Sequence, residues 1–411
     1  MKKTLVCLGL VLLSSSMIFA QKAKVNKAYN YLWTEPINYE AARMAIEEAK
    51  ADAVTGTEAK TWYVAGRIGY TQANEEIKKT LLSQTPDNDR LYVGLDEMYT
   101  NYVIADKYDG KLDKKGKVKY TQRKTIKADF KEMHNQYINT GAAFYDQRKY
   151  NEAAKMFNEY VAIADLSMFD AKDGIKVDST YWMVKHYVAL SNIRAEKNEE
   201  AIKSLLELKD TKYSDMKSIY ELLVGAYINI GDTVKYVAYL KEGAEKFPSS
   251  DYFVGSLVNY YVGAGEYDEA MAYLDQVIAK DPNNTEYMNV KAELLVQKND
   301  YEKAKEVLNK SLSIDPKNAR TLYVYGRAWA FEGDHIQESA QDLTDNAKYN
   351  AEMNRAKSCY VKALEYFEPA KELMQKDNVQ YMDLLQNMKV LYLRLEQTDK
   401  YNAISEEIKT L

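Results

Sequence analysis

Two stretches of this sequence decide its fold: AGEYDEAMAYLDQVIAKDPNN at residues 264–284 and KNDYEKAKEVLNKSLSIDPKN at residues 298–318. They are offset by 34 residues, and residues of several chemical types recur at the same offset. The recurring residues are Tyr267 with Tyr301, Ala270 with Ala304, Gly231 with Gly265, Leu240 with Leu274 and Leu308, and Pro248 with Pro282 and Pro316. A fixed period of this length is the signature of a repeat architecture.

The recurring residues have separate physical roles. Gly265 supplies a tight turn between two helices, and Ala270 and Ala304 are small where neighbouring helices approach closely. The prolines at 282 and 316 each end one helix and precede the next. Between these markers the apolar residues follow a helical period, and no stretch alternates as a strand would. The sequence therefore predicts an all-α fold of paired helices.

The pattern over residues 217–334 resembles the tetratricopeptide repeat, in which 34 residues form two antiparallel helices. The resemblance implies a right-handed superhelical solenoid of helix-turn-helix units. Weaker copies extend the array in both directions, to about nine repeats in all. Across residues 22–411 the chain is similar to exported tetratricopeptide-repeat proteins of Bacteroidetes, with phrases such as Tyr366-Phe367-Glu368 and Lys400-Tyr401-Asn402.

The first twenty residues predict a signal peptide. Lys2 and Lys3 precede a short apolar stretch, and Ala20 stands at the cleavage position. We expect export to the periplasm or beyond in a Gram-negative bacterium. Cys7 lies inside the apolar stretch and not after it, so no lipid anchor is expected. The later segments carry frequent charges, so no transmembrane segment is predicted.

The charge and the cysteine content argue against a nucleic-acid-binding protein and against a fold stabilised by disulfide bonds. The formal net charge is −5, and losing Lys2 and Lys3 with the signal peptide would bring it to about −7. Without basic runs, such a chain is a poor binder of nucleic acid, whose phosphates must be neutralised by Lys and Arg. Cys359 is then the only cysteine, so no intrachain disulfide is expected.

The array is expected to be interrupted at several places. We predict N-terminal repeats over 21–165, with an insertion near 84–90 and an exposed loop at 109–119 whose charge run indicates a solvated linker. An irregular connection follows at 166–179. C-terminal repeats then occupy 180–411, with an insertion at 335–352 and a terminal capping helix pair. The second insertion is either a helical decoration or a binding lid.

Groups able to carry catalysis are scarce. The three histidines lie in different repeats, and no phosphate-binding loop or nucleophile elbow is present. The spacing of His335, Glu338 and Asp342 would permit a metal cluster, but solvated helices produce such spacing often. Cys359 falls on an apolar helix, where a buried thiol is expected. We predict no catalytic site, cofactor or metal.

The repeat frame predicts where a partner would bind. The first helix of each repeat lines the inner groove of such a solenoid, a surface suited to an extended peptide or a helix. In cytosolic chaperone-binding members a Lys and Asn clamp grips a carboxylate, whereas the matching places here hold Glu221, Gly225, Gly255 and Glu293. The frame directs seven residues toward the groove: Tyr252, Asn259, Asn289, Glu293, Arg320, Tyr323 and Arg327.

These observations predict a non-enzymatic scaffold for protein–protein interaction in the periplasm or cell envelope. Asn can bond a peptide backbone, Arg can hold a carboxylate with two parallel bonds, and Tyr offers flat contact area. The alternative is that the seven groove residues are merely solvated and bind no partner. The 36 tyrosines also suggest a glycan- or nutrient-binding envelope protein, in which Tyr252 and Tyr323 would stack on sugar rings.

Overall fold

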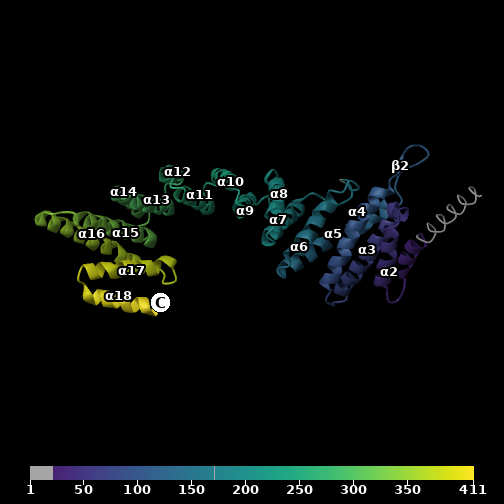
Figure 1. The fold of residues 1–411 in the computed structure, drawn as a ribbon, viewed down its shortest axis with the longest axis horizontal. Helices are drawn as coiled ribbons and strands as arrows, with labels where there is room; N and C mark the ends of the chain where they lie inside the picture. The colour runs from purple at the N-terminus through teal and green to yellow at the C-terminus, as the bar shows by residue number, and fades with distance from the viewer. Residues whose placement is uncertain (1–21, 171) are drawn as a thin grey trace, which may run out of the picture. The chain divides into compact units, whose positions relative to one another are not determined.

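The computed structural model describes residues 22–170 and 172–411. The predicted signal peptide, residues 1–20, lies outside them. Successive helices run antiparallel as pairs along the chain (Figure 1). The chain divides into two compact units, one up to Tyr239 and one from Leu240.

The first unit starts with helical residues 22–31, and a short 3-10 helix, Thr55–Thr57, follows its second helix. Its further helices are α2 (Tyr39–Lys50), α3 (Ala59–Leu81), α4 (Asn88–Asp109), α5 (Arg123–Asp146), α6 (Tyr150–Ala164), α7 (Ser179–Arg194), α8 (Asn198–Lys209) and α9 (Met216–Asn229). The boundary between the units falls within α10 (Thr233–Lys246).

The second unit continues the same alternation. Its helices are α11 (Asp251–Gly263), α12 (Tyr267–Lys280), α13 (Thr285–Gln297), α14 (Tyr301–Ile314), α15 (Ala319–Ala340), α16 (Asn346–Leu373), α17 (Val379–Arg394) and α18 (Thr398–Thr410). Counted over the described residues, the helices form nine pairs, in agreement with the repeat number expected from the sequence.

The recurring residues act as their chemistry predicts. Gly265 has a φ of +77°, a conformation that glycine adopts without strain. The Asn284 side chain accepts a hydrogen bond from the Tyr287 N–H and caps α13, and Asn318 caps α15 in the same way. Ala270, Leu274, Ala304 and Leu308 are fully buried between helices (0% exposed each). The all-α repeat fold is therefore confirmed.

Of the two predicted insertions, the first is mainly a short connection and the second is mostly helical. Within the stretch 84–90 the structure has only a short connection, because α3 and α4 are both long and α4 already begins at Asn88. The insertion at 335–352 lengthens α15 and α16, which are joined by residues 341–345. Of the two alternatives, a binding lid and a helical decoration, the insertion is therefore the helical decoration.

The loop expected at 109–119 is exposed but not irregular. Strands β1 (Lys111–Leu112) and β2 (Val118–Lys119) pair antiparallel there as a small hairpin, which was not predicted from the sequence. Between α6 and α7, residues 165–170 and 172–178 form no regular helix, and this connection is not wholly exposed. Met168 is buried, and Phe169 packs against the core of the first unit.

Helices α3 and α4 approach so closely that glycine is required between them. A methyl group at Gly69 would lie 2.5 Å from the Gly94 carbonyl oxygen and 2.6 Å from the Met98 nitrogen, and neither backbone atom can move aside. We expect Gly69→Ala to lower the free energy of unfolding of this unit by about 2 kcal/mol. Urea titration followed by circular dichroism would measure the change.

Gly225, also inside a helix of the first unit, provides the matched control. A methyl group there meets no atom within 4 Å. We expect Gly225→Ala to raise the free energy of unfolding by about 0.5–1 kcal/mol, because alanine is the better helix former. Changes of the same sign in both variants would contradict the tight packing of α3 on α4.

Candidate functional site

The seven residues predicted for the groove all lie in the second unit, on the first helices of three consecutive pairs. Helix α11 carries two of them, α13 two and α15 three. The residues are Tyr252 and Asn259 on α11, Asn289 and Glu293 on α13, and Arg320, Tyr323 and Arg327 on α15.

Ion pairs join α13 to α15. The Arg320 guanidinium pairs with the carboxylates of Glu286 and Glu293, and its nitrogen lies 3.6 Å from the Glu293 oxygen. Burial raises the pKa of Glu293, while the positive charges of Arg320 and Arg327 act in the opposite direction. The structure thus brings Glu293, Arg320 and Arg327 into one charged cluster.

Arg327 is positioned by aromatic rings and not by a carboxylate. Its guanidinium carbon lies 5.6 Å from the centre of the Tyr323 ring and 5.3 Å from that of Phe331. Within residues 22–170 and 172–411, Arg327 forms no ion pair. Its N–H donors are therefore open to a partner.

A hollow of about 500 Å³ lies beside Arg327. Its wall combines polar side chains with apolar ones, as sites for peptides and small molecules do. The lining residues are Glu293, Val296, Gln297, Asn299, Tyr301, Val324, Arg327, Phe331 and Gln380.

Asn289 lies one helical turn before Glu293 and is completely buried (0% exposed). Neither atom of its side-chain amide has a hydrogen-bond partner among the described residues, and the same holds for Nε of Arg320. Buried polar groups are nearly always paired, so each such atom needs an explanation. Asn289 is enclosed by the surrounding helices and does not line the hollow beside Arg327.

The two tyrosines of the predicted set differ in exposure. Tyr252 is 41% exposed, whereas Tyr323 is 2% exposed, and the Tyr323 hydroxyl donates a hydrogen bond to the carboxylate of Asp383 on α17. The buried Tyr323 ring therefore contacts the Arg327 guanidinium and has no exposed face for a ligand. The glycan-binding alternative loses one of the two ring faces on which it depended.

Of the nine lining residues, the predicted set contained only Glu293 and Arg327, and it missed Val296, Gln297, Asn299, Tyr301, Val324, Phe331 and Gln380. Phe331 follows Arg327 by four residues, so helical spacing could have indicated it. Gln297 and Asn299 lie at the end of α13 and just after it, outside the repeat positions that the frame directs toward the groove. Gln380 comes from α17, and nothing in the local sequence links it to α13.

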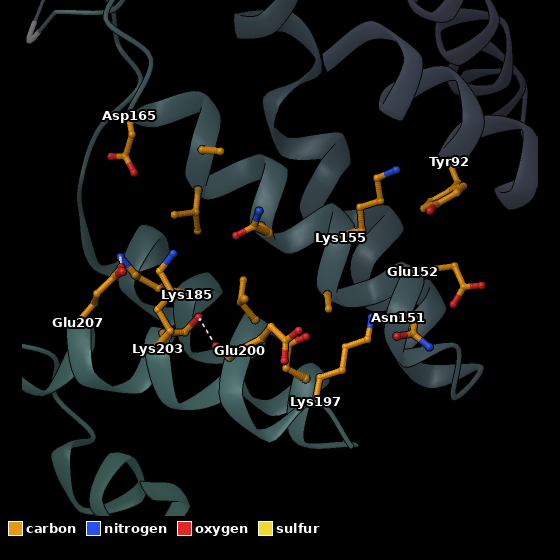
Figure 2. A pocket seen from close by; sticks show the side chains of 17 residues that line it. Tyr92, Asn151, Glu152, Lys155, Asp165, Lys185, Lys197, Glu200, Lys203 and Glu207 are labelled. Carbon is orange, nitrogen blue, oxygen red and sulfur yellow. Dashed lines mark hydrogen bonds and ion pairs between the residues drawn. The ribbon is translucent and has the colours of Figure 1, made fainter. Parts of the chain in front are cut away.

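A second hollow, of about 660 Å³, lies in the first unit against α6, α7 and α8 (Figure 2). Four lysines and four carboxylates line it, so its charges balance. Lys155 already pairs with Asp96 at 2.7 Å, and Lys185 pairs with Glu207 at 2.5 Å. The balance gives this hollow no preference for an anion or a cation.

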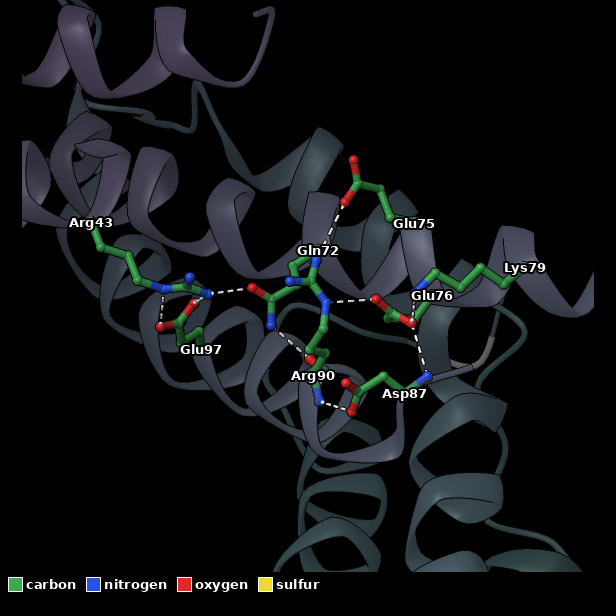
Figure 3. A network of polar contacts seen from close by, with 8 residues as sticks. All are labelled: Arg43, Gln72, Glu75, Glu76, Lys79, Asp87, Arg90 and Glu97. Carbon is green, nitrogen blue, oxygen red and sulfur yellow. Dashed lines mark hydrogen bonds and ion pairs between the residues drawn. The ribbon is translucent and has the colours of Figure 1, made fainter. Parts of the chain in front are cut away.

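A third hollow, of about 800 Å³, lies near the start of the first unit and includes Arg43 and Arg90. Figure 3 shows that both guanidinium groups are occupied. Arg43 donates to Glu97 at 2.7 and 2.8 Å, and Arg90 donates to Glu76 at 2.6 Å. These contacts join α2, α3 and α4, so we assign them to stability.

Two of the three histidines, His134 and His186, are used structurally. Nε2 of His134 lies 2.9 Å from the Tyr160 carbonyl oxygen, and Nδ1 of His186 lies 3.0 Å from the Tyr213 hydroxyl. Burial lowers the pKa of both rings. Helix α15 ends at Ala340, so Asp342 does not continue the helical face of His335 and Glu338.

Two further features concern possible chemistry and location. The described residues contain no group of three His, Cys, Asp or Glu side chains placed to hold a metal ion. In that same part of the chain, every helix is too short or too polar to span a bilayer. Cys359 is buried (4% exposed) as predicted, and burial raises the pKa of its thiol.

Comparisons with known proteins find tetratricopeptide repeats. The family model of this repeat matches residues 231–294 and 261–325. No curated protein sequence matches the chain. Among solved structures, the C-terminal part of a tetratricopeptide-repeat protein from Cytophaga hutchinsonii is 16% identical with a TM-score of 0.43, covering 67% of this chain and 95% of that one.

Two other solved structures are similar at the same level. A tetratricopeptide-repeat protein from Bacteroides fragilis is 18% identical with a TM-score of 0.32, covering 63% of this chain and 98% of that one. A MamA fragment from Desulfovibrio magneticus is 19% identical with a TM-score of 0.32, covering 48% of this chain and 93% of that one. The matched repeats and the all-α fold support the general role of a protein-interaction scaffold.

Proposed function

We propose that this protein is a non-enzymatic scaffold, exported to the periplasm or cell envelope, that binds a peptide or helix of another protein in the hollow between α13 and α15. One observation carries the proposal: Arg327 is held over two aromatic rings beside a hollow and has no ion pair within the described residues. An arginine positioned in this way is prepared to receive a carboxylate from outside the chain.

The lining of the hollow indicates the chemistry of that partner. Val296, Val324 and Phe331 offer apolar contact, while Gln297 and Gln380 offer amide donors and acceptors. A peptide with an acidic side chain next to an apolar one would satisfy both kinds of surface. Its backbone would exchange hydrogen bonds with the side-chain amides of Gln297 and Gln380.

Export and the absence of catalysis are part of the same proposal. The charged and apolar pattern of the first twenty residues supports export. The tetratricopeptide repeat is typically a scaffold, and His134 and His186 are engaged in packing. Detection of the protein in the cytoplasmic fraction of its own host would overturn the export part of the proposal.

Site-specific photocrosslinking tests the binding part. A benzoylphenylalanine at the exposed, hollow-lining Gln297 is expected to give discrete protein adducts in the host cell. The same probe at Lys357, exposed on α16, serves as the position control. Arg327→Glu is expected to reduce the Gln297 adducts at least about tenfold, because it removes a hydrogen-bonded charge pair.

Lys357→Glu controls for the change in charge, since it alters the net charge equally outside the hollow. It should leave the Gln297 adducts unchanged. Identical adducts from both probe positions, or adducts insensitive to Arg327→Glu in a variant with unchanged circular dichroism, would refute binding in this hollow.

A further inference from the structure

The hairpin between α4 and α5 is an exposed, two-faced element. It projects beyond the ends of the two helices that flank it (Figure 1). Leu112 pairs directly with Val118, and these side chains are 73% and 53% exposed. Tyr120, 39% exposed, lies just beyond β2, and its ring stacks against the Arg123 guanidinium, whose carbon is 3.3 Å from the ring centre. Two apolar side chains, those of Leu112 and Val118, are thus exposed to water on one small face.

The rest of the hairpin concentrates positive charge. Lys111 lies directly opposite Lys119, an arrangement of like charges that weakens strand pairing. Residues 110–120 hold five lysines and one aspartate, a net charge of +4 on a chain whose formal net charge is −5. In the described chain none of these lysines forms an ion pair. The five are Lys111, Lys114, Lys115, Lys117 and Lys119.

The base of the hairpin is fastened firmly. The buried carboxylate of Asp109 accepts hydrogen bonds from the backbone N–H groups of Thr121, Gln122 and Arg123 at 3.0, 2.7 and 3.0 Å. Arg123 also donates to both oxygens of Asp106, at 2.5 and 2.7 Å. The first unit therefore presents the charged tip and the apolar pair on a rigid support.

We propose that this hairpin docks the protein on a membrane surface rich in acidic phospholipids. The apolar face would enter the headgroup region, while the flexible lysine side chains reach the lipid phosphates. Both unfavourable features of the isolated hairpin, the opposed lysines and the exposed apolar pair, would be relieved by the same surface.

The observations favour a lipid surface over an acidic protein. Lysine is a compact point charge suited to a diffuse field, whereas specific recognition of carboxylates in proteins is typically made by the two-pronged guanidinium of arginine. Two exposed apolar side chains are also far fewer than the twenty or more residues that a stable protein interface uses on each side. Near an acidic membrane, in contrast, each lysine strengthens binding about fivefold.

Vesicle cosedimentation of the protein lacking its signal peptide tests the proposal. We expect binding to vesicles of phosphatidylglycerol and phosphatidylcholine, and none to pure phosphatidylcholine. Replacing Lys111, Lys115 and Lys119 together with alanine should weaken binding about a hundredfold. Leu112→Ser alone should weaken it to a smaller extent, and high salt should weaken binding of the wild type.

A matched control removes three lysines that are exposed in the second unit. Lys310, Lys317 and Lys357 form no ion pair within the described residues, and their joint replacement by alanine changes the net charge equally. It should leave vesicle binding unchanged. Equal loss in both triple variants, or no binding of the wild type to acidic vesicles, would overturn the proposal. Binding of a poly-glutamate peptide without vesicle binding would overturn it too and assign the hairpin to an acidic protein.

Discussion

Replacing Arg67 with methionine is expected to lower the free energy of unfolding of the first unit by about 3–5 kcal/mol. Arg67 on α3 pairs with Asp129 on α5 at 2.8 Å, and the Asp129 side chain is only 7% exposed. The Tyr102 hydroxyl donates to the same carboxylate at 2.5 Å. Without the guanidinium, this carboxylate would remain buried with a single donor, and leaving a charge unpaired in the interior is costly.

A second substitution identifies the cause. In Arg67→Met/Asp129→Asn the buried charge is gone, while the amide oxygen still accepts from Tyr102, so we expect at least half of the lost stability to return. Lys362→Met, in the exposed pair with Glu365, should change stability by less than about 0.5 kcal/mol. Urea titrations of the four proteins would decide. A cost for Arg67→Met no larger than that for Lys362→Met would contradict the buried pair.

Glu159→Gln is expected to remove a large pH dependence of stability. Glu159 on α6 is 3% exposed and lies beside Asp96, and burial, then the neighbouring Asp96 charge, raises its pKa from 4.5 to about 9. The folded protein therefore keeps the carboxyl neutral at pH values where the unfolded chain has released the proton. Between the two pKa values the native state binds more protons, so its stability falls as the pH rises, by up to about 1.4 kcal/mol per pH unit.

Glutamine resembles the neutral carboxyl group and does not ionise. The variant should match the wild type below the ordinary glutamate pKa and exceed it increasingly toward alkaline pH. Urea titrations over a pH series would measure both curves. Glu199→Gln, at an exposed position of α8, is the control and should leave the pH dependence unchanged. Parallel curves for Glu159→Gln and the wild type would show that Glu159 is charged in the folded protein.

The positions of the helices could be predicted because their determinants are local. The turn at Gly265, the caps at Asn284 and Asn318 and the buried faces around Leu274 and Leu308 each depend on residues within a turn or two. The distribution of the site residues over α11, α13 and α15 followed from the same frame. The burial of Tyr323 did not, because Asp383 and Phe367, which hold it, lie 60 and 44 residues further along the chain.

The lengthened helices α15 and α16 likewise could not be predicted from local sequence. The local sequence of the 18-residue insertion is compatible with either a lid or a helical decoration. Which of the two forms depends on whether α15 and α16 can pack along their full length. They can, because Gly333 leaves room for the ring of Tyr360, whose hydroxyl donates to Asp334 and Gln337. The hairpin is similar, since only cross-strand pairing shows that Lys111 faces Lys119 and Leu112 faces Val118.

The sequence by itself determined the repeat period, the helices and their caps, because backbone preference and apolar periodicity act over a few residues. Tertiary structure alone decided which polar groups are paired. Arg327 is left with open donors, Asn289 is left unsatisfied and Glu159 is kept neutral by neighbours from other helices. Charge and hydrogen bonding depend on distances between atoms that packing brings together, and such distances are not encoded in local spacing.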